Sequence, residues 1–278
     1  MPELAEVNIQ VEYLRERCEG WKIASFGWHG GQHFKSTREP GQVESFFEGN
    51  TIEEITQRGK QVIFRTARGV ALSHLMFRGR WSVQDDPFTS NYKHHKELPL
   101  DKSRTVWMVT ATGARLNFHT PRYQAKLSVF PGIKDPGDVE QLTKLGPEVL
   151  ITPMTDEVFA RVAWDLEYFA GMARKSRQVI KSFLLDQKKQ SGLGNMYVCE
   201  ALYRAGVSPH RKSNALSEAE VERLHAAARE LLGEAVRSQL EYDALISVYR
   251  RTVDPEGSAV VSEKLGGRDT FWVRGTQV

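Results

Sequence analysis

Apolar positions at the start of the chain repeat with the period of an α-helix. Leu4, Val7, Val11, Leu14 and Cys18 fall on one stripe, which predicts a helix over residues 3–19. Because this helix begins almost at the first residue, its packing is expected to hold the terminal residues against the body of the domain.

Short β-rich runs replace the helical pattern between residues 21 and 130, with turn signals such as Gly30-Gly31 and Thr112-Gly113 between them. The predicted strands are Ile52–Ile55, Val62–Phe64, Val70–Leu75, Thr105–Thr112, Ala114–Phe118 and Leu127–Phe130. Many short strands are typical of a sandwich or barrel. The polar stretch 84–102 is predicted to be a long exposed loop.

Helical patterns dominate after residue 131. The predicted helices are Asp138–Leu145, Thr155–Trp164, Gln178–Leu185, Met196–Ala205 and Ser217–Gln239. The last begins with Ser217 and Glu220 in capping-box spacing, and the end of the chain returns to β character. We therefore predict an α+β fold with three parts: an N-terminal β-sandwich domain with a leading helix (residues 1–131), a helical domain (132–240) and a small C-terminal hairpin (241–278).

The composition narrows the class of protein. Of 278 residues, 40% are hydrophobic and 26% charged, which is typical of a soluble globular protein. We see neither an apolar run of membrane-spanning length nor a signal peptide. The only cysteines are Cys18 and Cys199, which excludes a disulfide framework and a four-cysteine zinc site. We expect no bound metal.

Positive charge is concentrated in one segment. The net charge of the chain is +3, but residues 174–212 hold nine Lys or Arg against Asp186 and Glu200, a local balance of +7. Such a segment indicates either a face that meets phosphates or a solvated helix surface, and charge alone does not separate the two.

Three separated segments resemble the formamidopyrimidine-DNA glycosylase and endonuclease VIII family. They are residues 1–7 (MPELAEV), residues 180–206 (from IKSFLLDQ through GLGNMY to EALYRAG) and residues 267–272 (GRDTFW), with a weaker match at 145–150. The second segment resembles the family's helix–two-turn–helix element. The third resembles its β-hairpin finger in a version without zinc ligands, in which packing around Phe271 and Trp272 replaces the metal.

The resemblance implies a nucleophile at the start of the chain. Removal of Met1 would expose the secondary amine of Pro2, and a free α-amino group titrates near pH 8, so part of it is neutral at pH 7. Such an amine can attack C1′ of a damaged nucleotide. Glu3 matches the family's general acid, although a glutamate there also stabilises a helix dipole. Glu6 matches an acidic family position, which is expected to orient the Pro2 amine and Glu3. Lys60 matches a family lysine that reaches the scissile phosphate.

Further positions match the family's DNA-binding residues. His74 matches a phosphate contact. Gly192 and Gly194 form a turn before a helix N-terminus, where backbone amides bind phosphate. Asn195 and Lys181 are expected to assist there, together with Arg268 at the tip of the finger. The residues that fill the gap left by an everted base are expected among Met76, Phe77, Arg122 and Tyr123. Gln124 departs from the family pattern, and burial in a strand is an equal alternative for Met76 and Phe77.

These matches predict a monomeric bifunctional DNA glycosylase and abasic-site lyase that needs no cofactor. Its expected partner is damaged DNA, either double- or single-stranded. Its expected location in a bacterium is the cytoplasm, in association with the nucleoid. A predicted finger strand at Ala244–Arg250, soon after the long helix, leaves no room for a loop that caps oxidised guanine, which favours oxidised pyrimidines.

Three alternatives stay open. The chain could remove oxidised purines, act on interstrand cross-links, or be a catalytically silent relative that only binds damaged DNA. The joint presence of Pro2, Glu3 and Lys60 argues against a silent relative, since pure binding has no need of a terminal secondary amine.

Overall fold

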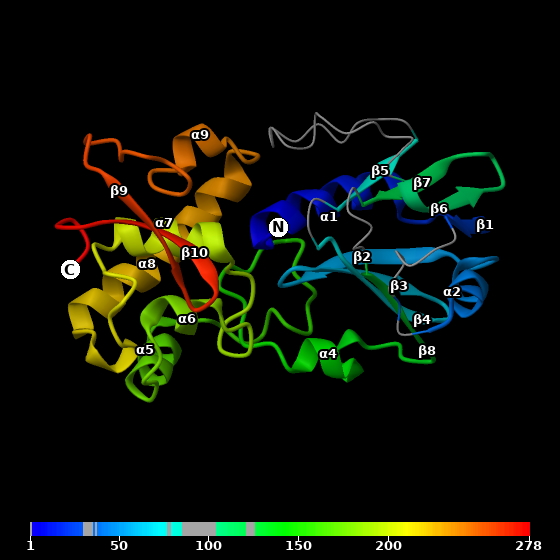
Figure 1. Ribbon diagram of the computed structural model, residues 1–278. Coiled ribbons are helices and arrows are strands. Elements are labelled where there is room, and N and C mark those ends of the chain that lie inside the picture. Colours follow the sequence, from blue (N-terminus) through cyan, green and yellow to red (C-terminus); the bar gives the residue numbers. More distant parts are fainter. Residues whose placement is uncertain (1, 30–35, 37, 77–78, 85–103, 121–125) are drawn as a thin grey trace. The chain divides into compact units, whose positions relative to one another are not determined.

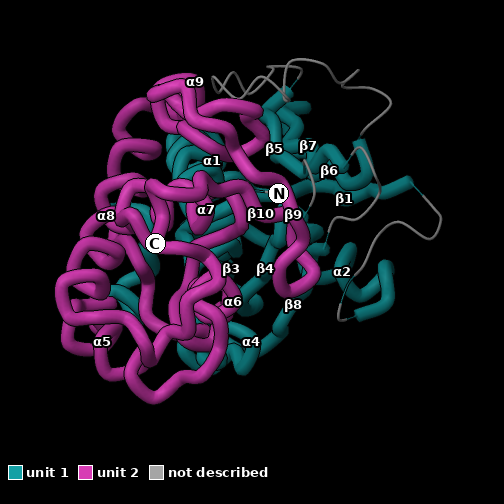
Figure 2. Tube along the Cα trace, turned by 60° about the vertical axis from the view of Figure 1, so that its left-hand side comes forward, with its two compact units in different colours: residues 1–144, 152–160 teal, residues 145–151, 161–278 magenta. Residues whose placement is uncertain are grey.

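A computed structural model describes residues 2–278 apart from 30–35, 37, 77–78, 85–103 and 121–125 (Figure 1). The chain divides into two compact units, which Figure 2 colours separately. Unit 1 comprises residues 1–144 and 152–160, and unit 2 comprises residues 145–151 and 161–278. The loop predicted at 84–102 lies outside the described residues except for its first position.

Unit 1 contains two four-stranded antiparallel sheets, with strand orders β1-β6-β7-β5 and β2-β3-β4-β8. The first sheet consists of β1 (Ile23–Trp28), β6 (Arg104–Thr110), β7 (Arg115–His119) and β5 (Arg80–Val83). The second consists of β2 (Ile52–Arg58), β3 (Gln61–Thr66), β4 (Gly69–His74) and β8 (Lys126–Pro131). Unit 1 also contains the helices α1 (Leu4–Cys18), α2 (Pro40–Phe47), η2 (Pro136–Asp138) and α4 (Glu140–Thr143).

One buried tryptophan joins the two sheets. The indole of Trp81 on β5 stacks on Phe118 of β7, with ring centroids 4.4 Å apart, and meets the edge of Phe64 on β3 at 5.4 Å. Its Nε1 donates to Ser73 Oγ on β4 at 3.0 Å. Since these partners come from both sheets, the sheets share one aromatic core, as in a sandwich. The predicted β-rich N-terminal domain is confirmed.

Helix α1 is buried on more than its apolar stripe. The predicted stripe is fully enclosed, and so are the polar residues Asn8 and Gln10. The helix packs against β2 and β3 of one sheet and β5 of the other. Gln10 Oε1 accepts a hydrogen bond from the backbone N–H of Trp81 at 2.8 Å. Contact with both sheets therefore explains why polar positions are buried beside the apolar ones.

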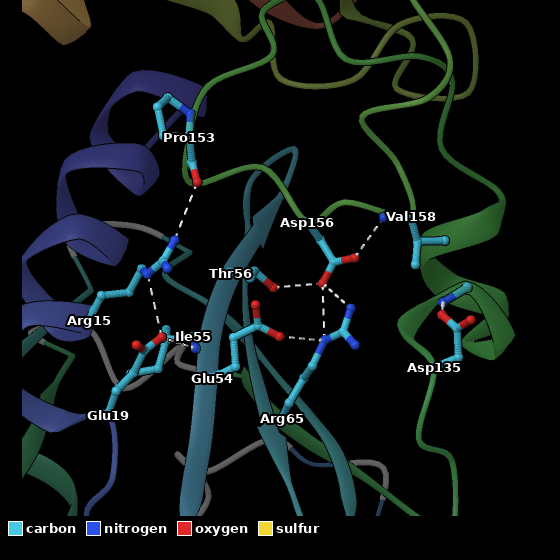
Figure 3. A network of polar contacts seen from close by, with 11 residues as sticks. Arg15, Glu19, Glu54, Ile55, Thr56, Arg65, Asp135, Pro153, Asp156 and Val158 are labelled. Carbon is cyan, nitrogen blue, oxygen red and sulfur yellow. Dashed lines mark hydrogen bonds and ion pairs between the residues drawn. The ribbon is translucent and has the colours of Figure 1, made fainter.

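The helix predicted at Thr155–Trp164 is wrong; the chain forms turns there. The cause is Asp156, whose buried carboxylate serves three other groups (Figure 3). Its Oδ2 accepts from Thr56 Oγ1 and from Arg65 Nη2, both at 2.8 Å, and its Oδ1 accepts from the backbone N–H of Val158 at 3.2 Å. A turn places the carboxylate over sheet β2-β3-β4-β8, and this tertiary contact overrides the local helical pattern.

Unit 2 contains the helices and a terminal hairpin. Its elements are α5 (Leu166–Arg174), α6 (Ile180–Leu185), α7 (Asn195–Arg204), η3 (Ser213–Ala215), α8 (Glu218–Arg237), α9 (Tyr242–Leu245), β9 (Val260–Leu265) and β10 (Arg268–Val273). Ser217 and Glu220 form the predicted capping box of α8. Among the described residues, no helix combines the length and the apolar character that a membrane span requires.

The finger strand predicted at Ala244–Arg250 is also wrong. Helix α9 covers the first part of this stretch, and the hairpin begins only at Val260. The buried carboxylate of Glu200 on α7 accepts hydrogen bonds from the consecutive backbone amides of Ser247, Val248 and Tyr249, at 2.8, 3.0 and 2.7 Å. Three successive amides that converge on one carboxylate require a curled backbone, whereas the amides of a strand alternate in direction.

Candidate active site and DNA-binding elements

The N-terminal residues of unit 1 are held in place by their own helix. Pro2 and Glu3 are buried, and Glu3 is the N-cap of α1, in extended conformation. Glu3 and Glu6 form a capping box, in which Glu6 Oε2 accepts from the backbone N–H of Glu3 at 2.9 Å. Glu3 therefore caps the helix, and Glu6 fixes the peptide next to Pro2.

Lys60 occupies the two-residue turn between β2 and β3, directly after Gly59, whose φ of 55° favours glycine. The turn is tied to α1 through Gln57, a buried residue that sequence reasoning missed. A polar residue near the end of a strand carries no signal that distinguishes it from a solvent-facing one.

His74 ends strand β4 and lies between two lysines. Its cross-strand partner on β8 is Lys126, and its partner on β3 is Gln61, the neighbour of Lys60. Burial first, and then the charges of Lys60 and Lys126, lower the pKa of His74 from 6.5 to about 4. His74 is therefore neutral at pH 7.

The hydrogen bond that His74 accepts determines which ring nitrogen carries its proton. His74 Nδ1 accepts from the backbone N–H of Met76 at 2.9 Å, so the proton of the neutral ring is on Nε2, as a donor. Together with the two lysines, this donor forms a cluster suited to an anion. Sequence reasoning missed Lys126, because only strand register places it beside His74.

Of the four residues expected to fill the gap left by an everted base, the structure describes Met76 alone. Phe77, Arg122 and Tyr123 lie outside the described residues. Met76 is half-buried, follows the end of β4 and has a positive φ of 49°. It is therefore not a strand residue, and its insertion into DNA stays a prediction.

In unit 2, residues 186–194 connect α6 to the N-terminus of α7, and this segment ends in a turn. Gly192 has a φ of 107°, and Gly194 is the N-cap of α7. The side chain of Gln187 shapes this turn: its Oε1 accepts from the N–H of Gly192 at 3.1 Å, and its Nε2 donates to the carbonyl of Leu193 at 2.7 Å. Gly192 and Gly194 therefore lie next to the N-terminus of the ten-residue helix α7, which is the positive end of the helix dipole.

The tip of the hairpin is fastened to both helices of this element. Asn195, the first residue of α7, donates from Nδ2 to the backbone carbonyl of Asp269 at 2.8 Å. Lys181 of α6 is fully buried, and its Nζ donates to the same carbonyl at 2.8 Å and to Thr270 Oγ1 at 2.5 Å. Arg268, which precedes these residues on β10, is exposed. Asn195, Lys181 and the backbone next to Arg268 therefore come together.

The expectation for Lys181 needs correction. We expected its charge to surround the turn and attract phosphate, but its ammonium group is enclosed and its hydrogen bonds go to the hairpin. Burial lowers its pKa. Lys181 holds the finger in place, while Arg268 presents the exposed charge.

The hairpin is stabilised by side chains. Glu263 Oε1 accepts from Trp272 Nε1 at 2.6 Å and lies 2.7 Å from His210 Nε2, and the His210 and Trp272 rings meet edge to face at 5.3 Å. The pKa of Glu263 lies below its usual value, and the hydrogen bond with His210 is the largest cause. Phe271 packs edge to face on Tyr249, with centroids 5.1 Å apart. The two aromatic residues that the sequence singled out thus pack within the hairpin and against its neighbours.

The residues present do not fit a zinc-bound finger. Both cysteines lie outside β9 and β10. Within the described part of the chain, no group of three or more His, Cys, Asp or Glu side chains is arranged to hold a metal ion.

Comparison with known proteins identifies both halves of the chain. The formamidopyrimidine-DNA glycosylase N-terminal domain matches residues 1–127, and the formamidopyrimidine-DNA glycosylase H2TH domain matches residues 151–243. The formamidopyrimidine-DNA glycosylase of Bacillus subtilis is 32% identical over 92% of this chain and 83% of its own. The enzyme of the same name from Rhodopseudomonas palustris is 32% identical over 98% of both chains.

Solved structures match over nearly the whole length. The formamidopyrimidine-DNA glycosylase of Lactococcus lactis, bound to DNA with an abasic site, superposes with a TM-score of 0.82 at 25% identity and 99% coverage of both chains. A MutM structure in complex with DNA containing carbocyclic 8-oxo-G superposes with the same TM-score, identity and coverage.

Proposed function

Because the chain belongs to the formamidopyrimidine-DNA glycosylase family, we propose that it removes oxidised or ring-opened purines from DNA and then cuts the strand. DNA glycosylase and abasic-site lyase activity follow from the family, and damaged DNA is the partner. The lesion, the residues and their roles are our proposal. The observation that carries it is the capping box of Glu3 and Glu6, which holds Pro2 and the carboxyl group beside it in a fixed, buried position.

The preference for purines rests on two observations. The curated relatives are named for formamidopyrimidine, a ring-opened purine, and solved relatives hold DNA with 8-oxo-G or N7-benzyl-Fapy-dG. The argument for pyrimidines assumed that a finger strand follows the long helix within a few residues. In the structure, residues 238–259 separate α8 from β9, so that argument loses its premise.

The chemistry proposed for Pro2 begins with its free amine. The nitrogen lone pair attacks C1′, the bond to the damaged base breaks, and Glu3 supplies a proton to the sugar ring oxygen or the base. The Pro2 nitrogen gives its own proton to whichever of these two leaving groups Glu3 has not protonated, and opening of the sugar then gives an iminium between Pro2 and C1′. This group accepts the electrons released when C2′ loses a proton, so the bond to the 3′ phosphate breaks, and a second elimination breaks the bond to the 5′ phosphate. Water then frees the amine.

The remaining residues are assigned to the phosphates. Lys60, His74 and Lys126 form a cluster of two charges and one neutral donor in unit 1, which suits a phosphodiester. In unit 2, Arg268 provides an exposed charge and the N-terminus of α7 provides positive potential. Asn195 holds the backbone beside Arg268.

Covalent trapping on defined DNA tests the proposal. Borohydride reduces the iminium, so protein with a free Pro2 should become linked to an abasic oligonucleotide, and peptide mapping should locate the link at Pro2. Protein with an N-terminal tag should give no adduct, because the free amine has moved away. An adduct at wild-type yield with Pro2 blocked would make a lysine the nucleophile, and no adduct with unblocked protein would favour a silent binder.

The lesion is tested with duplexes that carry 8-oxoguanine, formamidopyrimidine-guanine or thymine glycol. We expect faster release of both purine lesions than of thymine glycol under single-turnover conditions. Faster release of thymine glycol would restore the pyrimidine alternative. Glu3→Gln should slow base release more than cleavage of a ready-made abasic site, since in the latter the base is already gone.

A further inference from the structure

The side chain of Gln57 joins the two segments of unit 1 that carry the proposed chemistry. Its Nε2 donates to the backbone carbonyl of Leu4 at 3.0 Å and to that of Gly59 at 2.9 Å. Leu4 directly follows Glu3, and Gly59 directly precedes Lys60. One amide group thus connects the first turn of α1 with the turn between β2 and β3.

The orientation of this amide is determined by its surroundings. Both carbonyls require a donor, so the NH₂ group must face them and the oxygen must face away. That oxygen accepts from Asn8 Nδ2 at 3.2 Å, and the same nitrogen donates to Thr152 Oγ1 at 2.6 Å. The backbone N–H of Gln57 donates to the carbonyl of Met154 at 2.7 Å. The residue is therefore held on its side chain and on its backbone.

Burial makes this arrangement rigid. Gln57 is 1% exposed and Asn8 is 3% exposed, so water does not compete for their hydrogen bonds. A buried amide stabilises a structure only when its groups are paired with good geometry, and a paired network of this kind permits one arrangement of the segments it joins.

We propose that Gln57, oriented by Asn8, is a positioning residue that sets the placement of Pro2 and Glu3 relative to Lys60. The inference rests on the proposed function, because it assigns a role in catalysis to the two segments. A displacement of about 1 Å between reacting groups can reduce a rate by about a hundredfold. Loss of the amide should therefore affect the chemical step more than DNA binding.

Gln57→Met tests the inference, because it keeps the length of the side chain and removes both donors. Gln10→Met is the matched control: Gln10 is also buried, lies on α1, and has its hydrogen bond with Trp81, away from Leu4 and Gly59. Each variant loses buried hydrogen bonds, so both should have a lower Tm. Asn8→Ala is a third variant, which leaves the Gln57 amide in place but removes the group that orients it.

The measurement separates rate, amount and affinity. Single-turnover borohydride trapping on an abasic duplex gives an amplitude, which counts folded protein, and a rate constant, which reports the chemistry. Binding to a duplex with an uncleavable tetrahydrofuran site gives Kd. For Gln57→Met we expect a rate constant at least about tenfold below that of Gln10→Met, with Kd within about twofold of wild type, and an intermediate rate constant for Asn8→Ala.

Equal rate constants for Gln57→Met and Gln10→Met would overturn the inference, whatever their amplitudes. If Gln57→Met does not fold, Asn8→Ala decides: a wild-type rate constant overturns the inference and a reduced one supports it. Failure of the proposed function has a different result: either protein with a blocked Pro2 would still be trapped, or wild-type protein with a free Pro2 would give no adduct at all.

Discussion

Lys181 and Asn195 donate hydrogen bonds to the same oxygen, the backbone carbonyl of Asp269, each at 2.8 Å. The first residue comes from α6 and the second from α7, so both helices of the element hold the strand that begins with Arg268. An exposed arginine on a short hairpin is placed accurately only if the hairpin is fixed, and this shared carbonyl is where it is fixed.

Loss of Lys181 and loss of Arg268 should therefore weaken DNA binding in different ways. Arg268→Ala removes a phosphate contact, so the slope of log K against log salt should become shallower by about one unit. Lys181→Met should weaken binding with the slope unchanged, and should lower the free energy of unfolding by about 1–3 kcal/mol, because the buried Thr270 loses its donor and the Asp269 carbonyl loses one of its two donors. Salt titrations and urea unfolding measure both. A shallower slope for Lys181→Met would mean that its charge reaches DNA.

The lowered pKa of His74 predicts a loss of stability in acid. Histidine titrates near pH 6.5 in the unfolded chain and near 4 in the folded protein. Between these values the unfolded chain binds a proton that the folded protein does not, so the free energy of unfolding falls as the pH falls from about 6.5 to about 4. By pH 4.5 the loss due to His74 should be about 2–3 kcal/mol.

His74→Asn isolates this contribution, because asparagine can accept the Met76 amide without titrating. Urea unfolding at pH 7.5, 5.5 and 4.5 should show a smaller acid loss for the variant than for wild type. Parallel losses would place the pKa of His74 at its ordinary value. DNA binding through the neutral His74 should not change between pH 6 and 8.

Lys126 should contribute to DNA affinity although no sequence motif marks it. Lys126→Ala should weaken binding to all sequences alike and reduce the salt slope by about one unit, while Lys126→Arg keeps most of the affinity. Lys144→Ala is the control in the same unit, since Lys144 is exposed and pairs with Glu140 one turn earlier on the surface. Equal affinities for the two alanine variants would remove Lys126 from the phosphate cluster.

The finger should depend on its side chains and not on a metal. Strong chelators should leave activity and Tm unchanged. Trp272→Phe keeps most of the ring packing but loses the hydrogen bond to Glu263, and should lower the free energy of unfolding by about 1 kcal/mol. Thermal unfolding and elemental analysis test this. One zinc ion per chain, with loss of DNA binding on its removal, would contradict it.

Periodic patterns predicted the elements whose environment is simple. The stripe of α1, the strands β2, β3, β4, β6, β7 and β8, and the helices α6, α7 and α8 all follow from local apolar spacing. The helices α2, with Pro40 at its first position, and α5 were missed, and so were the strands β1 and β5. Strand β5 is only four residues long, which is too short for a clear pattern. Its Trp81 is fixed by packing between the two sheets, and a short stretch of sequence does not show these distant contacts.

The wrong elements have a common cause. Asp156 and Glu200 are buried carboxylates that bind backbone or side-chain donors distant in sequence, and each bends a segment that local spacing predicted to be regular. The candidate site shows the same limit. Motifs identified Pro2, Glu3 and Lys60, whereas Gln57 and Lys126 are recognised only once the strand register and the tertiary hydrogen bonds are known.

Asp156 also determines how the protein can be divided. Residues 152–160 belong to unit 1 although residues 145–151, which precede them, belong to unit 2. A fragment cut at residue 131 or 144 would lack the carboxylate that Thr56 and Arg65 share, so Thr56 Oγ1 would lose this acceptor and Arg65 would keep, among the described residues, only its ion pair with Glu54. A graft or split of this protein must therefore carry two pieces of chain for unit 1, because no single cut separates the units.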